Sequence, residues 1–452
     1  MNKIAKWVLT AATIAVVFLG ATWAAGFVAH KRVAVFSDRV AEQSNGLLQV
    51  AERTSTAGYF SSIEDVTFAV ATPLLSLAPG LQRGDGSKLQ FTIHSVIAHG
   101  PFPNFRGVGV ARVESSLVLD DATRKKLIEL LGTDQPFAIA VTLGWLGGTQ
   151  IDLTSPALTY RDNNNATSVT WKGMQARLDY SRDFLGMEFS GSVPGISLVS
   201  KTGGEFSIDN VQAKGDFKSK FDPLFVGDEL ITIASISYKM SEAKSGPFLA
   251  KDISYGVHAG AEKEFFSLSA KLGAASAEAD VYALKDTHFD FGVNHLHGPT
   301  VAKLIKEAQN VRRTRPDGEP IALPSTDAMQ AGAADLLLNQ PELFVDRLAL
   351  ATKDGDLKIS ARAKLVDIAT EDVKPSINFG RLTNKVMATA DISVSQSLID
   401  HWPGAEANTA NIKKMISEFD RSGYLVRKGD RLETHFEFSK GALTANGKAV
   451  GK

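Results

Sequence analysis

The stretch FAIAVTLGW, residues Phe137–Trp145, decides the fold class. Large apolar side chains occupy every second position, namely Phe137, Ile139, Val141, Leu143 and Trp145. Small or polar residues fill the positions between them. Because side chains alternate between the two faces of a β-strand, this period of two predicts a strand in a sheet with one buried face.

Similar segments recur on both sides of this stretch. Strands are expected at residues 58–70, 89–93, 151–160, 167–179, 186–190, 196–200, 205–213, 230–240, 251–259, 265–272, 277–284, 288–293, 357–365, 386–394, 431–439 and 442–450. Turn signals such as Asp162–Asn165 separate several of them. Sequential strands joined by short turns favour an antiparallel meander. We therefore expect a mainly β fold with helical insertions (α+β), built on an elongated, twisted antiparallel sheet.

Helical spacing of apolar residues interrupts the strands in only a few places. Thr300–Arg313 and Ser325–Leu350, the latter interrupted at Pro341, flank a loop rich in Pro and Gly. A further helix is expected at Asn408–Ser422. These segments divide the chain after its N-terminal part into three regions. They are a β-rich region over residues 58–298, a helical insertion over 299–350, and C-terminal strands with a helix over 351–452.

The N-terminal part contains an uncharged run of 22 residues, Trp7–Val28. A helix of this length, rising 1.5 Å per residue, crosses the ~30 Å hydrocarbon core of a bilayer. We therefore expect an uncleaved transmembrane anchor over residues 1–32, with the membrane contacted through residues 7 to 28. A removed signal peptide is the alternative, although Trp23 fits its cleavage site poorly. The pattern that follows predicts a juxtamembrane helix and linker over residues 33–57.

The charges that flank the run do not decide its orientation. Lys3 and Lys6 precede the run, whereas Lys31, Arg32 and Arg39 follow it. A short tail stays behind easily during export, so we expect the N-terminus inside and the remaining chain on the far side of the membrane.

Composition excludes several classes of protein and site. The 49 basic and 50 acidic residues give a net charge of −1, which argues against nucleic acid as a partner. The chain has no cysteine, so it has no disulfide, thiolate metal site or cysteine nucleophile.

Catalytic and metal-binding patterns do not emerge from the sequence. The phosphate-binding G-x-x-x-x-G-K-[ST], the H-E-x-x-H and the G-x-S-x-G motifs are all missing. His295 and His297 form an H-x-H pair near Asp290, but no further ligand completes a metal site, which favours a polar strand end before Gly298. We expect a protein without catalytic, cofactor-binding or metal-binding residues, and not an enzyme.

Two short motifs carry a family resemblance. The first is Gly58, Tyr59, Phe60, Ser61 and Ser62, and the second is His99, Gly100, Pro101, Phe102 and Pro103. Together with Val169–Gly173 and Lys440–Lys448, this pair resembles the YdgA-like proteins of Gram-negative bacteria. The resemblance implies a single-span inner-membrane protein with its bulk in the periplasm, in a family of uncharacterised function.

The residues of the second motif also have a direct physical interpretation. Pro101 and Pro103 lack a backbone donor and fix φ, so they end a strand. Gly58 and Gly100 suit a positive φ or a close backbone approach. We expect Phe102 to be buried as a structural anchor; the alternative is a loop that contacts a partner or lipid.

The expected function follows from a sheet with one apolar face. Such a sheet, if curled, forms a groove similar to that of AsmA-like envelope proteins, which are associated with lipid traffic; the analogy is one of fold. The first hypothesis is a lipid or another apolar ligand bound by the lining Phe137, Ile139, Val141, Leu143 and Trp145. The second is an envelope scaffold that binds a protein partner or self-associates through edge strands.

Overall fold

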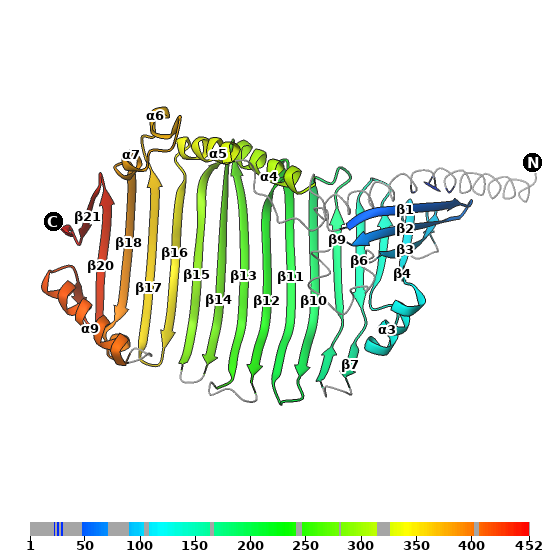
Figure 1. Cartoon of the computed structure of the whole chain (residues 1–452), viewed down its shortest axis with the longest axis horizontal. Helices are drawn as coiled ribbons and strands as arrows, with labels where there is room; N and C mark the ends of the chain where they lie inside the picture. Colours follow the sequence, from blue (N-terminus) through cyan, green and yellow to red (C-terminus); the bar gives the residue numbers. More distant parts are fainter. Residues whose placement is uncertain are drawn as a thin grey trace, which may run out of the picture. The chain divides into compact units, whose positions relative to one another are not determined.

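The computed structural model describes residues 22, 25, 26, 29, 48–70, 90–103, 108–162, 167–240, 246–279, 282–313, 326–401 and 406–451. Within these ranges the chain is mainly β with few helices, and its strands pair antiparallel in a large open sheet (Figure 1). This confirms the predicted mainly β, antiparallel class. The chain divides into two compact units: unit 1 holds residues 1–162, 170–191 and 308–323, and unit 2 holds 163–169, 192–307 and 324–452.

Unit 1 is a run of short strands with one helix. Its elements are β1 (Leu48–Ala57), β2 (Ser61–Val70), β3 (Gln90–His99), β4 (Ala111–Val118), α3 (Asp121–Leu131), β5 (Ala138–Leu143), β6 (Thr149–Ser155), β7 (Leu158–Asp162) and β9 (Met174–Tyr180). Ladders run in the order β1, β2, β3, β4, β5, β6 and β9. The strand β8 (Thr167–Trp171) and the strand β10 (Gly186–Val199) have residues in both units.

The prediction of a linker up to Ala57 is wrong, because Leu48–Ala57 forms the strand β1. This strand pairs with β2 from Leu48 opposite Val70 to Ala57 opposite Ser62, with a bulge between Val50 and Glu52. The segment lacks apolar alternation, so pairing with β2 rather than its own pattern makes it a strand. The helix predicted from Val33 to about Gln49 is wrong at its end, which lies in β1, and its residues 33–47 lie outside the described residues.

The core of unit 1 combines strand residues with helical ones. Ile97, Ala111, Val113, Val141, Leu143 and Ile151 form a buried cluster with Ala25 and Ala29. Thr22, Ala25, Gly26 and Ala29 are helical, and their spacing of three and four places them on one helix face. The remainder of the predicted anchor lies outside the described residues. Among the helices that the structure describes, none has the length and hydropathy needed to cross a bilayer.

Unit 2 is built on longer strands. They are β11 (Glu205–Phe221), β12 (Leu224–Lys239), β13 (Phe248–Glu262), β14 (Phe265–Ala279), β15 (Tyr282–His297), β16 (Glu342–Thr352), β17 (Gly355–Leu365), β18 (Val386–Ser395), β19 (Val426–Lys428), β20 (Arg431–Ser439), β21 (Ala442–Ala445) and β22 (Lys448–Ala449). Several extend beyond the predicted bounds, as β11 does past Ala213. Cross-strand pairing continues there through polar and glycine residues that carry no apolar period.

The helices of unit 2 agree with the sequence in part. They are α4 (Gly298–Arg313, its start in unit 2), α5 (Thr326–Leu338), α6 (Thr370–Val373), α7 (Phe379–Thr383), α8 (Gln396–Asp400) and α9 (Glu406–Arg421). The helix predicted at 325–350 ends at Leu338, and Glu342–Thr352 is instead β16. Pro341 stops the helix, and the apolar residues after it pair with both β15 and β17.

Candidate functional site

One face of the unit 2 sheet carries mainly apolar rows that cross nine strands, interrupted by Glu229, Thr434 and two glycines. Antiparallel register aligns residues of one face, so each row takes one residue from each of β11 to β18 and from β20. The first row is Ala213, Ile231, Tyr255, Leu272, Phe289, Leu348, Ile359, Ile392 and Thr434. The second is Gly215, Glu229, Val257, Ala270, Phe291, Val345, Ala361, Ala390 and Phe436. The third is Phe217, Gly227, Ala259, Leu268, Val293, Leu343, Ala363, Ala388 and Phe438. We call this surface the apolar face.

Large side chains on the apolar face remain accessible to solvent. The exposed fractions lie between 37% and 62% for Tyr255, Leu268, Leu272, Phe289, Phe291 and Leu343. Among the described residues, α4 covers an end of the third row, where Ala302 packs with Ala259. Exposed apolar side chains that lie next to one another in this way make the face a candidate binding surface.

The opposite face of the same strands is polar. One of its rows includes Lys214, Lys271, Asp290 and Arg347. On this face His258 Nδ1 lies 2.8 Å from Asp228 Oδ1, and His435 Nδ1 lies 2.8 Å from Asp391 Oδ1. The sheet is therefore amphipathic, with its polar face directed to water.

The apolar face is hollowed where β16, β17, β18 and β20 lie side by side. Alanines occupy the two middle strands, at Ala361 and Ala363 on β17 and at Ala388 and Ala390 on β18. Large residues stand on the outer strands, namely Leu343, Val345, Phe436 and Phe438. The difference in side-chain size leaves an open trough of about 340 Å³. That volume is within the range of small-molecule sites, and the lining is apolar.

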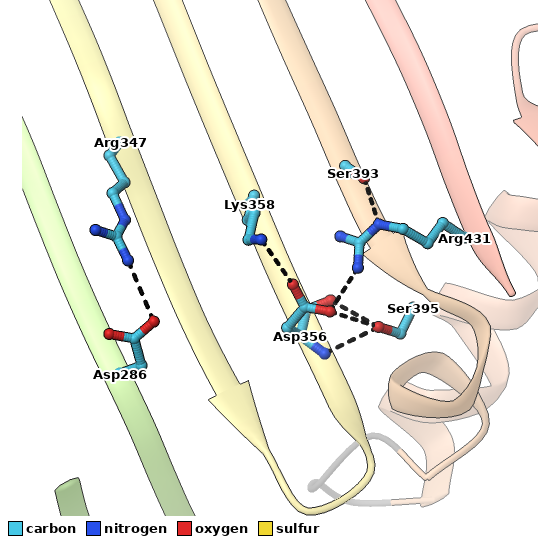
Figure 2. Close-up of polar contacts among 7 residues, drawn as sticks. All are labelled: Asp286, Arg347, Asp356, Lys358, Ser393, Ser395 and Arg431. Carbon is cyan, nitrogen blue, oxygen red and sulfur yellow. Dashed lines mark hydrogen bonds and ion pairs between the residues drawn. The ribbon is translucent and has the colours of Figure 1, made fainter. Parts of the chain in front are cut away.

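A polar cluster joins the ends of β17, β18 and β20 (Figure 2). Arg431 Nη1 donates to Asp356 Oδ1 at 2.6 Å, and Ser395 Oγ donates to the same oxygen at 2.8 Å. The Arg431 hydrogen bond, with smaller contributions from Ser395 and the charge of Lys358, lowers the pKa of Asp356 to about 2. Arg431 Nε also donates to Ser393 Oγ at 2.8 Å. These contacts hold the strand ends together, and a structural role explains all of them.

The two sequence motifs meet at the ends of β2 and β3. The Ser62 Oγ atom lies 3.0 Å from His99 Nε2, and the backbone N–H of His99 donates to Phe60 O at 2.8 Å. Gly100 has a φ of +111°, and a Cβ on Gly58 would lie 2.5 Å from Ser61 O. Both glycines therefore have the roles predicted for them.

The prediction of a buried Phe102 is wrong. Its side chain is 50% exposed, whereas Pro103 is fully buried. The Pro103 ring takes the interior position at this corner, so Phe102 points away from the core.

A model of one protein family, described as "Bacterial protein of unknown function (DUF945)", matches residues 1–451. The chain belongs to this family. No curated protein and no solved structure matches the DUF945 chain. The matched residues span both units, but the family description gives no activity.

In this DUF945 protein the predicted lining at Phe137–Trp145 does not form an open groove. Val141 and Leu143 are buried in the core of unit 1, and Ile139 packs against that core. Trp145 is exposed in the turn after β5, and Phe137 is half-buried. The helical residues Ala25 and Ala29 and the neighbouring strands close over this face.

The apolar face of the DUF945 protein lies outside the lining predicted from the sequence. Its signal was present in strands such as β14 and β15, where Leu268, Leu272 and Phe289 alternate with polar residues. The same alternation describes a covered sheet, so only the tertiary structure separates the two cases.

The H-x-H pair occupies the end of β15. His295 has a φ of +62°, and its Nδ1 lies 2.6 Å from Asn339 O. His297 Nδ1 lies 2.8 Å from Thr300 Oγ1. The two rings thus have different polar partners. In the described part of the chain, no three His, Asp or Glu side chains gather as a metal site.

Proposed function

We propose that this protein is a non-enzymatic, membrane-anchored protein of the bacterial envelope that binds lipid acyl chains on the apolar face of unit 2. The observation that carries the proposal is the three rows of exposed apolar side chains across nine strands. The YdgA-like resemblance of the two motifs supports an inner-membrane anchor and a periplasmic location. The proposal includes a curled sheet that shelters the bound acyl chain.

The dimensions of the apolar face suit a lipid tail. Nine strands at a spacing of about 4.8 Å give a band about 38 Å wide. This width exceeds the about 15 Å of hydrocarbon that one bilayer leaflet contributes. An acyl chain lying along a row would contact successive apolar side chains and gain about 0.8 kcal/mol for each buried CH₂ group. The trough between Leu343 and Phe436 offers a hollow for it.

A photocrosslinking experiment tests this proposal. A benzophenone amino acid replaces Leu272, Phe289 or Leu343 in the full chain, in bacteria labelled with radioactive phosphate. Matched controls carry the same amino acid at Lys271 or Asp290, which are neighbours in sequence on the opposite face. We expect phospholipid adducts after irradiation from the apolar face and none from the controls.

The outcomes separate the candidate functions. Lipid adducts confined to the apolar face support the proposal, and mass spectrometry of the adducts identifies the lipid class. Protein adducts from the same positions, without lipid, would overturn it in favour of an envelope scaffold or self-association. Equal labelling of both faces would show that the contact is not specific to the apolar rows.

A further inference from the structure

One edge of unit 1 gathers three strand connections. The register places the start of β2 beside the end of β3, as Ser61 pairs with Ala98. It also places the start of β4 between the ends of β3 and β5, since Ala111 pairs with both His99 and Leu143. Residues 58–60, 100–103 with 108–110, and 144–148 therefore follow one another along this edge. We call their described residues, 58–60, 100–103, 108–110 and 144–148, the turn edge.

Backbone hydrogen bonds tie the three connections together. The His99 N–H donates to Phe60 O at 2.8 Å, and the Val110 N–H donates to Leu143 O at 2.7 Å. Within the connections, the Gly109 N–H donates to Pro101 O at 3.3 Å and the Gly144 N–H to Gly148 O at 2.8 Å. The turn edge is therefore a preformed surface.

The side chains of the turn edge are unusual for strand connections. None of its described residues is charged, since they are Gly, Pro, Val, Leu and aromatic residues. Six large apolar side chains are exposed at their tips: Tyr59, Phe60, Phe102, Val108, Trp145 and Leu146. Leu146 is 91% exposed, and the other five are between 46% and 66% exposed. Loop tips in water usually carry polar residues, so this composition needs an apolar partner.

The uncharged run Trp7–Val28 reaches the folded unit at the same edge. A Cβ added to Gly26 would lie 2.7 Å from His99 Nδ1, and one added to Gly100 would lie 2.8 Å from Thr22 Oγ1. The helical residues thus pack directly against the start of the second connection. The membrane anchor of the proposed function, on which the inference rests, would bring a bilayer to the turn edge.

We infer that the turn edge inserts into the interfacial layer of a phospholipid bilayer. Tyr and Trp suit this layer because their rings are apolar and carry a polar tip. Leu146 and Phe60 then enter the boundary between headgroups and acyl chains, at a depth of about 5–10 Å. The contact orients unit 1 on the membrane and is independent of ligand binding by the apolar face of unit 2.

Single-cysteine labelling of the full chain tests the inference, because the chain has no native cysteine. The variants Phe60→Cys, Val108→Cys and Leu146→Cys carry an environment-sensitive fluorophore. The control Val118→Cys lies at the opposite end of β4 and is 48% exposed. The labelled chains are reconstituted into vesicles of phosphatidylethanolamine and phosphatidylglycerol. Lipid-attached nitroxide should quench the turn-edge labels at least about twofold more than the control, as expected for interfacial depth.

Each outcome bears on the inference. Blue-shifted emission and quenching by the lipid-attached nitroxide at the turn edge support the inference, provided that the Val118 label is quenched only by a water-soluble quencher. If the chains float with the vesicles but the turn-edge labels are quenched no more than the Val118 label, the inference is overturned and the anchor is not. Turn-edge labels that neither the lipid-attached nitroxide nor a water-soluble quencher reaches would also overturn the inference and indicate a protein contact. Chains that do not float with vesicles would overturn the inference together with the anchor, while crosslinking on unit 2 remains a separate test.

Discussion

At the scale of single residues, Asp356 carries the clearest electrostatic signature. Its pKa of about 2 lies below the ordinary value of 3.8, because Arg431 and Ser395 stabilise the carboxylate. A lowered folded-state pKa gives stability that is present above pH 3.8 and is lost as the pH falls toward 2. Since the side chain is 26% exposed, we set its contribution at about 1–2 kcal/mol.

The variant Asp356→Asn should therefore be less stable than the native chain at pH 7. Between pH 4 and pH 2 its free energy of unfolding should fall less than that of the native chain. Urea denaturation of the detergent-solubilised full chain at pH 7, pH 4 and pH 2 measures both effects. The control Asp286→Asn alters a carboxylate that is 69% exposed and pairs with His288 and Arg347, so the midpoint should change little. Equal midpoints for Asp356→Asn and the native chain at pH 7 would contradict the structural role of the cluster.

Gly100 is the second residue with a measurable consequence. Alanine there meets both a φ of +111° and a Cβ position 2.8 Å from Thr22 Oγ1, so Gly100→Ala should cost about 1–3 kcal/mol. Gly132→Ala is the matched control, because Gly132 also has a positive φ but no atom within 4 Å of the added Cβ. A urea midpoint for Gly100→Ala no lower than that of the control would refute the close packing.

At the scale of elements, the helical face formed by Thr22, Ala25, Gly26 and Ala29 closes the core of unit 1. The variant Gly26→Leu should separate this face from His99, since even a Cβ would lie 2.7 Å from the ring. Amide hydrogen exchange in β3 and β5 should then become faster, while exchange in β13 and β14 of unit 2 stays unchanged and serves as the internal control. Unaltered protection at Ile97 and Val141 would show that the helix does not stabilise these strands.

Across the whole molecule, the proposed lipid binding depends on the apolar face of unit 2. The double variant Leu272→Ser and Phe289→Ser removes two partly exposed apolar side chains from the first row, and Phe289 also stacks on Phe291. The free energy of unfolding should therefore fall by about 1–3 kcal/mol, and the chain is expected to stay folded. Phospholipid bound per chain, measured as organic phosphate after detergent exchange, should fall sharply. The control replaces Lys271 and Asp290 by Ser on the polar face and should retain its lipid. Equal lipid content in both variants would argue against ligand binding on this face.

Local pattern is enough to assign the periods of most elements and the chemistry of the turns. Alternation predicts most strands, Pro341 predicts the end of a helix, and the lack of a Cβ suits Gly58 and Gly100 to close backbone approach or positive φ. Only the tertiary structure decided that Leu48–Ala57 is a strand, that Val141 and Leu143 are buried, and that Leu272 and Phe289 are exposed. A strand shows the same alternation whether its apolar face is covered or open. What covers it depends on segments far away in the sequence, such as Ala25 over β5 and α4 over a corner of the unit 2 sheet.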